Sequence, residues 1–104
     1  MKSITVQELY KLMNNNEQIT LVDVREKMER AIASIKGSTH VPMMAIPHQI
    51  ELFNKNEPVY IFCHSGVRSA QASLYLEQQG FDSVNIIGGI HAWSTEVDSS
   101  VPTY

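Results

Sequence analysis

The residues of this chain that could do chemistry together lie in one seven-residue segment. It reads Cys63-His64-Ser65-Gly66-Val67-Arg68-Ser69, and Cys63 is the only cysteine of the chain. A continuous apolar run, Val59–Phe62, precedes the cysteine, as in a strand that is buried on both faces. A helix is predicted from about residue 68 to residue 79. The segment is therefore a loop that leads from a buried strand into a helix, with a thiol at its first position.

A thiol at this place should lose its proton easily. The first N–H groups of a helix lack intrahelical partners, and together with the helix dipole they favour negative charge. Successive N–H groups in a tight loop can form an anion-binding nest, and Gly66 permits the positive φ that such a nest can require. Arg68 adds a permanent charge whose planar fork matches oxyanions. Helix N-termini and a nearby arginine lower the pKa of cysteines to roughly 3.5–7.5 in general, so these features predict a thiolate nucleophile at Cys63.

The competing interpretation of Cys63 is an inert thiol in the core, which is common after an apolar strand. The residues around it argue against a core position, because several are small, polar or charged: Ser65, Gly66, Arg68 and Ser69. Such residues suit the mouth of a site, so we interpret Cys63 as a reactive thiol.

Other ionisable residues are candidates for supporting roles. Asp23 and Arg25 lie at the carboxyl end of a predicted strand and could orient the cysteine loop from behind, but a structural ion pair would also explain them. His64 adjoins the nucleophile, and we expect its side chain to face solvent. A zinc site needs about four ligands in one place, so we expect no metal and no cofactor. The remaining histidines show no ligand spacing: His40, His48 and His91.

The composition is that of one ordinary domain over residues 1–104. The chain has 43% hydrophobic residues, enough for one core, and its net charge is −3 without a basic block. Nucleic acid and anionic membranes are therefore poor candidates for a partner. Apolar runs stay well below the roughly 20 residues of a membrane span, and the first ten residues lack the apolar core of a signal peptide. We expect a cytoplasmic protein.

Local patterns along the chain alternate between strands and helices. Thr5 and Glu8 form a predicted capping box, followed by a helix that we expect to end over residues 14–16. Its apolar face consists of Val6, Leu9, Leu12 and Met13. Strands are predicted over residues 19–24, 39–41, 59–62 and 84–87. This alternation predicts an α/β fold with a mainly parallel sheet, in which ligands bind beyond the carboxyl ends of the strands.

Further helices connect these strands. One is predicted over residues 26–35, with Met28, Ile32 and Ile35 on its buried side, and another starts at Pro47. The helix over residues 68–79 ends at Gly80, a predicted C-terminal cap. Gly88 and Gly89 form a turn before a short helix over residues 90–93, since they lack the lysine and the spacing of a phosphate loop.

Four segments, in order along the chain, resemble the rhodanese family. They are Leu21-Val22-Asp23-Val24-Arg25-Glu26, Val59-Tyr60-Ile61-Phe62-Cys63, the loop from Cys63 to Ser69, and Gly88-Gly89-Ile90-His91-Ala92-Trp93. The resemblance implies a three-layer fold with a central five-stranded sheet flanked by helices. It departs from the family pattern at Ala33-Ser34-Ile35-Lys36-Gly37, where Gly-His-Ile-Pro-Gly is frequent. Residues 94–104 match no motif, and either disorder or docking on the domain is open for this tail.

The resemblance also implies an activity. Cys63 would take a sulfane sulfur from an anionic donor such as thiosulfate, carry it as a persulfide, and pass it to a thiol or cyanide acceptor. The loop N–H groups of residues 64–69 (His64, Ser65, Gly66, Val67, Arg68 and Ser69) would bind the persulfide, and Arg68 would hold the donor.

Two alternatives remain open at this stage. The chain could be a persulfide relay or binding module that meets a protein thiol partner, because the chemistry at Cys63 would be the same. It could also be a cysteine phosphatase or arsenate reductase of the same fold. Such phosphatases place five residues between cysteine and arginine, whereas four separate Cys63 from Arg68 here, which favours sulfur transfer.

Overall fold

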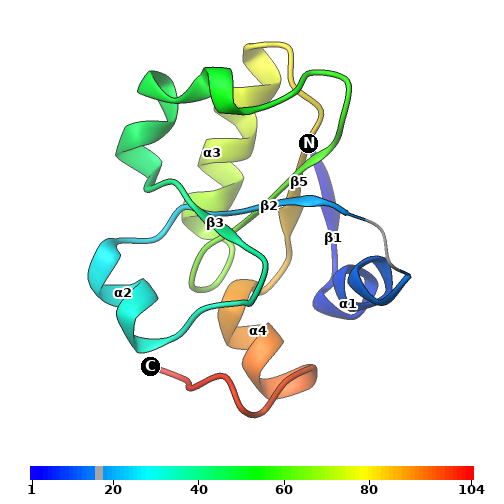
Figure 1. The fold of residues 1–104 in the computed structure, drawn as a ribbon, viewed down its shortest axis with the longest axis vertical. Coiled ribbons are helices and arrows are strands. Elements are labelled where there is room, and N and C mark those ends of the chain that lie inside the picture. The colour runs from blue at the N-terminus through cyan, green and yellow to red at the C-terminus, as the bar shows by residue number, and fades with distance from the viewer. Residues whose placement is uncertain (16–17) are drawn as a thin grey trace.

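The computed structural model describes residues 1–15 and 18–104, and it contains one parallel sheet (Figure 1). The strand order is β1-β5-β4-β2-β3, and the pairings between neighbouring strands are parallel. The strands are β1 (Lys2–Ile4), β2 (Thr20–Asp23), β3 (Thr39–His40), β4 (Val59–Phe62) and β5 (Ser83–Ile86). The α/β fold with a five-stranded parallel sheet is therefore confirmed.

Helices cover both faces of the sheet and make three layers. They are α1 (Val6–Asn14), α2 (Lys27–Ile32), α3 (Val67–Gln78) and α4 (Gly89–Glu96), with the 3-10 helices η1 (Met43–His48) and η2 (Ile50–Leu52). On one face α1 packs against α4, and Leu9 and Trp93 are buried in that core. On the other face α3 packs with η1, and Leu76 and Ile46 are buried.

Strand β4 shows why the apolar run before Cys63 is continuous. Phe62 lies in the core under α1 and α4, whereas Ile61 and Cys63 lie in the core under α3. Successive side chains of a strand point to opposite faces, and both faces of this strand are covered. The central position of β4 places the start of the cysteine loop at the carboxyl edge of the sheet.

The predicted helix over residues 26–35 is only partly correct. It ends at Ile32, and Met28 and Ile32 are 75% and 51% exposed instead of buried. Ile35 is buried, but it lies beyond the helix in a connecting segment. The apolar spacing predicted the wrong buried side of α2, because Glu29 faces the rest of the domain instead. Polar contacts hold Glu29 there, as the next subsection describes.

Other parts of the fold also differ in detail from what the sequence predicted. Pro47 lies inside η1 rather than opening an α-helix, and Ile46 and Phe53 are buried. Strand β5 begins and ends one residue earlier than predicted, and Ile87 is exposed. Strand β1 was not predicted at all, because it is a three-residue edge strand with a mostly exposed sequence.

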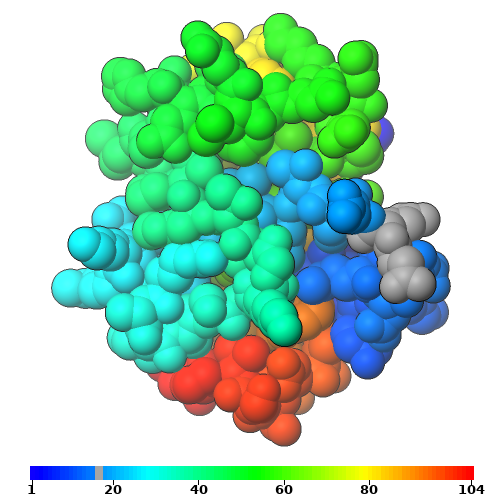
Figure 2. Space-filling view, in the orientation of Figure 1, coloured from blue at the N-terminus to red at the C-terminus, as the bar shows by residue number. Residues whose placement is uncertain are grey.

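The segment after Trp93 docks on the domain. Residues 94–96 complete α4, and the Ser94 hydroxyl donates to the Val101 carbonyl. Val101 is buried in the core under α1 and α4. In the space-filling view the tail lies against the segment around α2 (Figure 2).

The ends of the helices agree with the capping signals. Helix α1 begins with the predicted Thr5–Glu8 capping box and extends to Asn14, while the predicted end at Asn16 lies outside the described residues. Gly80, just after α3, has the positive φ of a helix-ending residue. In the described part of the chain no helix is both long and apolar enough to span a membrane.

Candidate active site

Cys63 lies directly after β4, and the start of α4 holds its loop in place. The Ile90 N–H donates to the Cys63 carbonyl at 2.9 Å, and the His91 N–H donates to the His64 carbonyl at 3.0 Å. Gly89 makes this approach possible, since a Cβ there would lie 2.6 Å from the His64 oxygen and closer still to the Cys63 oxygen. The glycine pair predicted as a turn therefore also positions the cysteine loop.

The Cys63 sulfur is surrounded by hydrogen-bond donors of its own loop. It accepts from the Gly66 N–H at 3.1 Å, and the Ser69 hydroxyl oxygen lies 3.3 Å away. Gly66 has φ of +109° and caps α3, so the loop adopts the positive φ that the sequence analysis anticipated. Only 1% of Cys63 is exposed, so the cysteine is almost fully enclosed by its surroundings.

These contacts favour the thiolate form of Cys63. Burial by itself raises the pKa of the thiol, but hydrogen bonds from the Ser69 hydroxyl and from the N–H groups of Ser69, Gly66 and Ser65 outweigh it. The pKa of Cys63 is consequently lowered below its ordinary value. A lowered pKa is typical of reactive cysteines rather than of inert core thiols, so Cys63 remains the candidate nucleophile of this site.

Asn85 on β5 is part of the site, and the sequence analysis missed it. Its side-chain amide donates to the Gly66 carbonyl at 3.3 Å, and its oxygen lies 2.5 Å from the Ser69 hydroxyl. Asn85 thus links the loop to the sheet and competes with Cys63 for the one proton of Ser69. A polar amide within a strand whose residues are all buried was the feature that could have indicated a role for Asn85 in the site.

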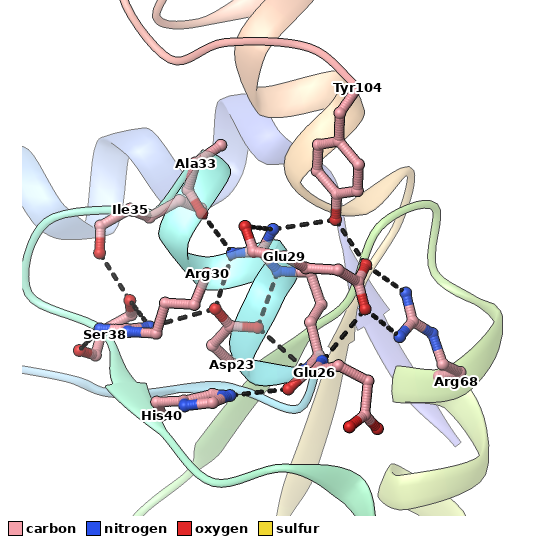
Figure 3. A network of polar contacts seen from close by, with 11 residues as sticks. Asp23, Glu26, Glu29, Arg30, Ala33, Ile35, Ser38, His40, Arg68 and Tyr104 are labelled. Atoms are coloured by element: carbon pink, nitrogen blue, oxygen red, sulfur yellow. Dashed lines mark hydrogen bonds and ion pairs between the residues drawn. The ribbon is translucent and has the colours of Figure 1, made fainter.

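Arg68 is paired with Glu29 of α2 rather than free at the mouth (Figure 3). Its two terminal nitrogens donate to the two carboxylate oxygens at 2.6 and 2.8 Å. The Tyr104 hydroxyl also donates to Glu29, at 2.7 Å. Glu29 and Tyr104 were not among the predicted site residues, because they lie 39 and 36 positions from Arg68 along the chain.

Asp23 and Arg25 form a buried ion pair. The Arg25 Nε and Nη2 atoms donate to the two Asp23 oxygens at 2.9 and 2.8 Å, and both residues are fully buried. Arg25 also donates to the Ala33 carbonyl at 2.6 Å and to the Tyr104 hydroxyl at 2.9 Å. No part of Arg25 is exposed, and it contacts the site from the interior through Tyr104 and through the Glu29 carbonyl at 3.3 Å.

The remaining loop residues face outward to different degrees. Ser65 and Val67 are exposed. His64 is half-buried rather than solvent-facing, because its ring stacks on Tyr104 with centroids 4.2 Å apart. The His91 ring meets the His64 ring edge to face at 6.0 Å. Over residues 1–15 and 18–104, no cluster of three or more candidate metal ligands is found.

The fold and this loop define a class of α/β proteins with a cysteine nucleophile at the end of a central parallel strand. A model of the rhodanese-like domain family matches residues 5–96, so the chain belongs to the rhodanese-like family.

Related proteins agree with this membership. A sulfurtransferase of Allochromatium vinosum is 39% identical over 92 residues, which cover 88% of this chain and 86% of that protein. The crystal structure of a rhodanese-like domain protein from Staphylococcus aureus has a TM-score of 0.89 and 42% identity, and the match covers 100% and 99% of the two chains. The adenylyltransferase and sulfurtransferase UBA4 of Yarrowia lipolytica is 34% identical over 103 residues, but the match covers only 26% of its length. Relatives with these names support a sulfur-transfer role for this chain.

Proposed function

We propose that the chain is a sulfurtransferase that carries a sulfane sulfur as a persulfide on Cys63. The observation that carries the proposal is the cysteine sulfur at hydrogen-bond distance from the Gly66 N–H and the Ser69 hydroxyl, at 3.1 and 3.3 Å. These hydrogen-bond donors stabilise negative charge on the cysteine sulfur before the sulfur-donating substrate arrives. They would stabilise the outer sulfur of a persulfide in the same way as an oxyanion hole stabilises oxygen.

In the proposed reaction the sulfur atom moves in two steps, first to Cys63 and then to the acceptor. The Cys63 thiolate attacks the terminal sulfur of thiosulfate, an S–S bond forms to Cys63, the S–S bond of the donor breaks, and sulfite leaves with the bonding electron pair. A thiol or cyanide then attacks the outer sulfur, which leaves with the acceptor while the Cys63 thiolate is regenerated. Because only 1% of Cys63 is exposed, we expect it to react with a donor that presents a single terminal sulfur atom.

Mass spectrometry of the intact protein tests this proposal. Incubation with thiosulfate should add one sulfur atom to the chain, dithiothreitol should remove it, and Cys63→Ser should not acquire it. Thiosulfate:cyanide and thiosulfate:thiol assays should show turnover that Cys63→Ser lacks. Normal turnover by Cys63→Ser would refute the proposal.

A persulfide relay to a protein thiol is the second candidate function. UBA4 of Yarrowia lipolytica bears the names of two activities on one longer chain, which supports a setting in which a rhodanese-like domain works beside other protein modules. The chemistry at Cys63 would be unchanged. A protein acceptor that discharges the Cys63 persulfide faster than cyanide or a small thiol at equal concentration would favour the relay.

A further inference from the structure

The Glu29 carboxylate, which pairs with Arg68 of the cysteine loop, accepts four hydrogen bonds. Two are donated by Arg68, one by the Tyr104 hydroxyl at 2.7 Å and one by the Glu26 N–H at 3.0 Å. A carboxylate has about four lone-pair positions, so all of them are used. These partners hold Glu29 in a single position against Arg68.

The position of Glu29 is also supported from the interior. Tyr104 donates to Glu29 (Figure 3), while its oxygen accepts from the buried Arg25 at 2.9 Å. The Tyr104 ring also stacks on the ring of His64, the residue after Cys63. Hydrogen bonds from Arg68, which outweigh burial, lower the pKa of Glu29 to about 2. Glu29 therefore stays ionised and paired at any pH at which the protein would work.

This arrangement changes what Arg68 can offer to an anionic donor. The Arg68 guanidinium has N–H groups left for another contact, since five are available and two are used. Its charge, however, is matched by the Glu29 carboxylate at 2.6 Å. A donor at the mouth meets a neutral pair rather than a free cation, with a fixed negative charge close by.

We propose that Glu29 is a specificity-determining residue that selects against doubly charged sulfur donors. The inference rests on the proposed function and deepens it, because it concerns the choice of donor at the same cysteine. Glu29 neutralises Arg68 and repels the sulfonate of a dianion, and Tyr104 keeps it in place. Donors with less charge at the end remote from the transferred sulfur are repelled less.

Two donors of the same geometry isolate this effect. Thiosulfate carries two negative charges, and methanethiosulfonate carries one because a methyl group replaces a sulfonate oxygen. Each gives its terminal sulfur to the Cys63 thiolate, and sulfite or methanesulfinate leaves with the electron pair of the broken S–S bond. The difference between the two rates reports the charge at the mouth.

The experiment compares sulfur loading of the full chain and of Glu29→Gln by both donors, at low and high ionic strength. Glu29→Gln should raise kcat/KM for thiosulfate about tenfold, equivalent to about 1.4 kcal/mol. The increase for methanethiosulfonate should be only about threefold, since it has half the charge, and salt should shrink both effects. Tyr104→Phe keeps the ring but removes one hydrogen bond to Glu29. It should therefore raise kcat/KM for thiosulfate about two- to threefold.

Two controls separate the local charge from other causes. Glu26→Gln removes a charge from an exposed side chain three residues before Glu29. It should leave the ratio of kcat/KM for thiosulfate to kcat/KM for methanethiosulfonate unchanged. Alkylation by iodoacetamide, a neutral reagent, should be equally fast in the wild type and in Glu29→Gln, which shows that the thiolate is unaltered.

The outcomes distinguish this inference from the proposed function. If the wild type takes sulfur from both donors but Glu29→Gln leaves their ratio unchanged or lowers thiosulfate turnover, Glu29 only supports Arg68 and the inference is wrong. An equal shift in Glu26→Gln would also overturn it, because general charge would explain the effect. If neither donor loads sulfur onto Cys63 in any variant, the proposed function fails and the inference fails with it.

Discussion

Ser69→Ala should raise the pKa of Cys63 and slow its reactions near neutral pH. The Ser69 hydroxyl is fully buried and lies 3.3 Å from the cysteine sulfur. It is the first of the contacts that lower the pKa of the thiol against the effect of burial. Without it, the thiolate keeps the N–H groups of the loop but loses its only side-chain donor among those contacts.

The size of the change follows from the hydrogen bond. A hydrogen bond to a charged group contributes about 1.5–3 kcal/mol, and 1.36 kcal/mol corresponds to about one pKa unit. The Ser69 proton is shared, because the Asn85 oxygen lies 2.5 Å away and competes for it. We therefore expect an increase of about one unit, at the lower end of that range.

The rate of iodoacetamide alkylation as a function of pH measures this pKa. The midpoint for Ser69→Ala should lie about one unit above that of the wild type, with the same limiting rate at high pH. Ser73→Ala is a matched control, because Ser73 lies one turn further along α3 and is equally buried. In the described part of the chain its hydroxyl oxygen has no hydrogen-bond partner, so its removal should leave the midpoint unchanged.

An unchanged midpoint in Ser69→Ala would show that the backbone N–H groups alone set the pKa of Cys63. An equal shift in Ser73→Ala would mean that loosening of α3, rather than the lost hydrogen bond, is responsible. Either result would refute the reasoning.

Three further predictions concern the charges and the length of the loop. Arg68→Ala should lower kcat/KM for thiosulfate by roughly one to two decades, because Glu29 loses its counter-charge. The double variant with Glu29→Gln should recover part of this loss, and a double variant as slow as Arg68→Ala would contradict the repulsion by Glu29. Contacts with Arg68 lower the pKa of Glu29 to about 2, below its value of about 4.3 in the unfolded chain. The free energy of unfolding should therefore fall as the pH drops from about 4.5 toward 2. Urea titrations at each pH should show a smaller fall for Glu29→Gln. Insertion of one glycine after Gly66 should depress sulfur loading of Cys63, and assays with p-nitrophenyl phosphate should find no hydrolysis by the wild type; cleavage of phosphate esters through Cys63 without sulfur loading would overturn the assignment.

The cysteine loop was predictable because its chemistry is local in the sequence. Gly66 and Ser69 reach the Cys63 sulfur from three and six positions away. At such distances the geometry follows from the strand before the loop and the helix after it. Residue type and spacing were therefore sufficient to predict a stabilised thiolate, and the lowered pKa of Cys63 agrees with that prediction.

Parts of the fold were predictable for the same reason, and others were not. The alternation of strands and helices is a property of short segments, and it predicted β4, α3 and the parallel sheet. The interior side of α2 is determined by Glu29, whose partners are far away in the sequence, so the exposed Met28 and Ile32 could not be foreseen. The choice between an α-helix and a 3-10 helix around Pro47 likewise depends on how the segment packs against α3.

Contacts within the cysteine loop and contacts from residues distant in sequence have different roles in the proposed site. The loop stabilises charge on the sulfur of Cys63, and this stabilisation is needed for every donor and acceptor. The cluster of Glu29, Arg68 and Tyr104 combines α2, the loop and the tail, and in our proposal it acts on the part of the sulfur donor that leaves. Changes in α2 or the tail can therefore alter donor choice without altering the nucleophile. A family that keeps one cysteine loop could in this way adapt to donors of different charge by exchanging residues far from the loop in sequence.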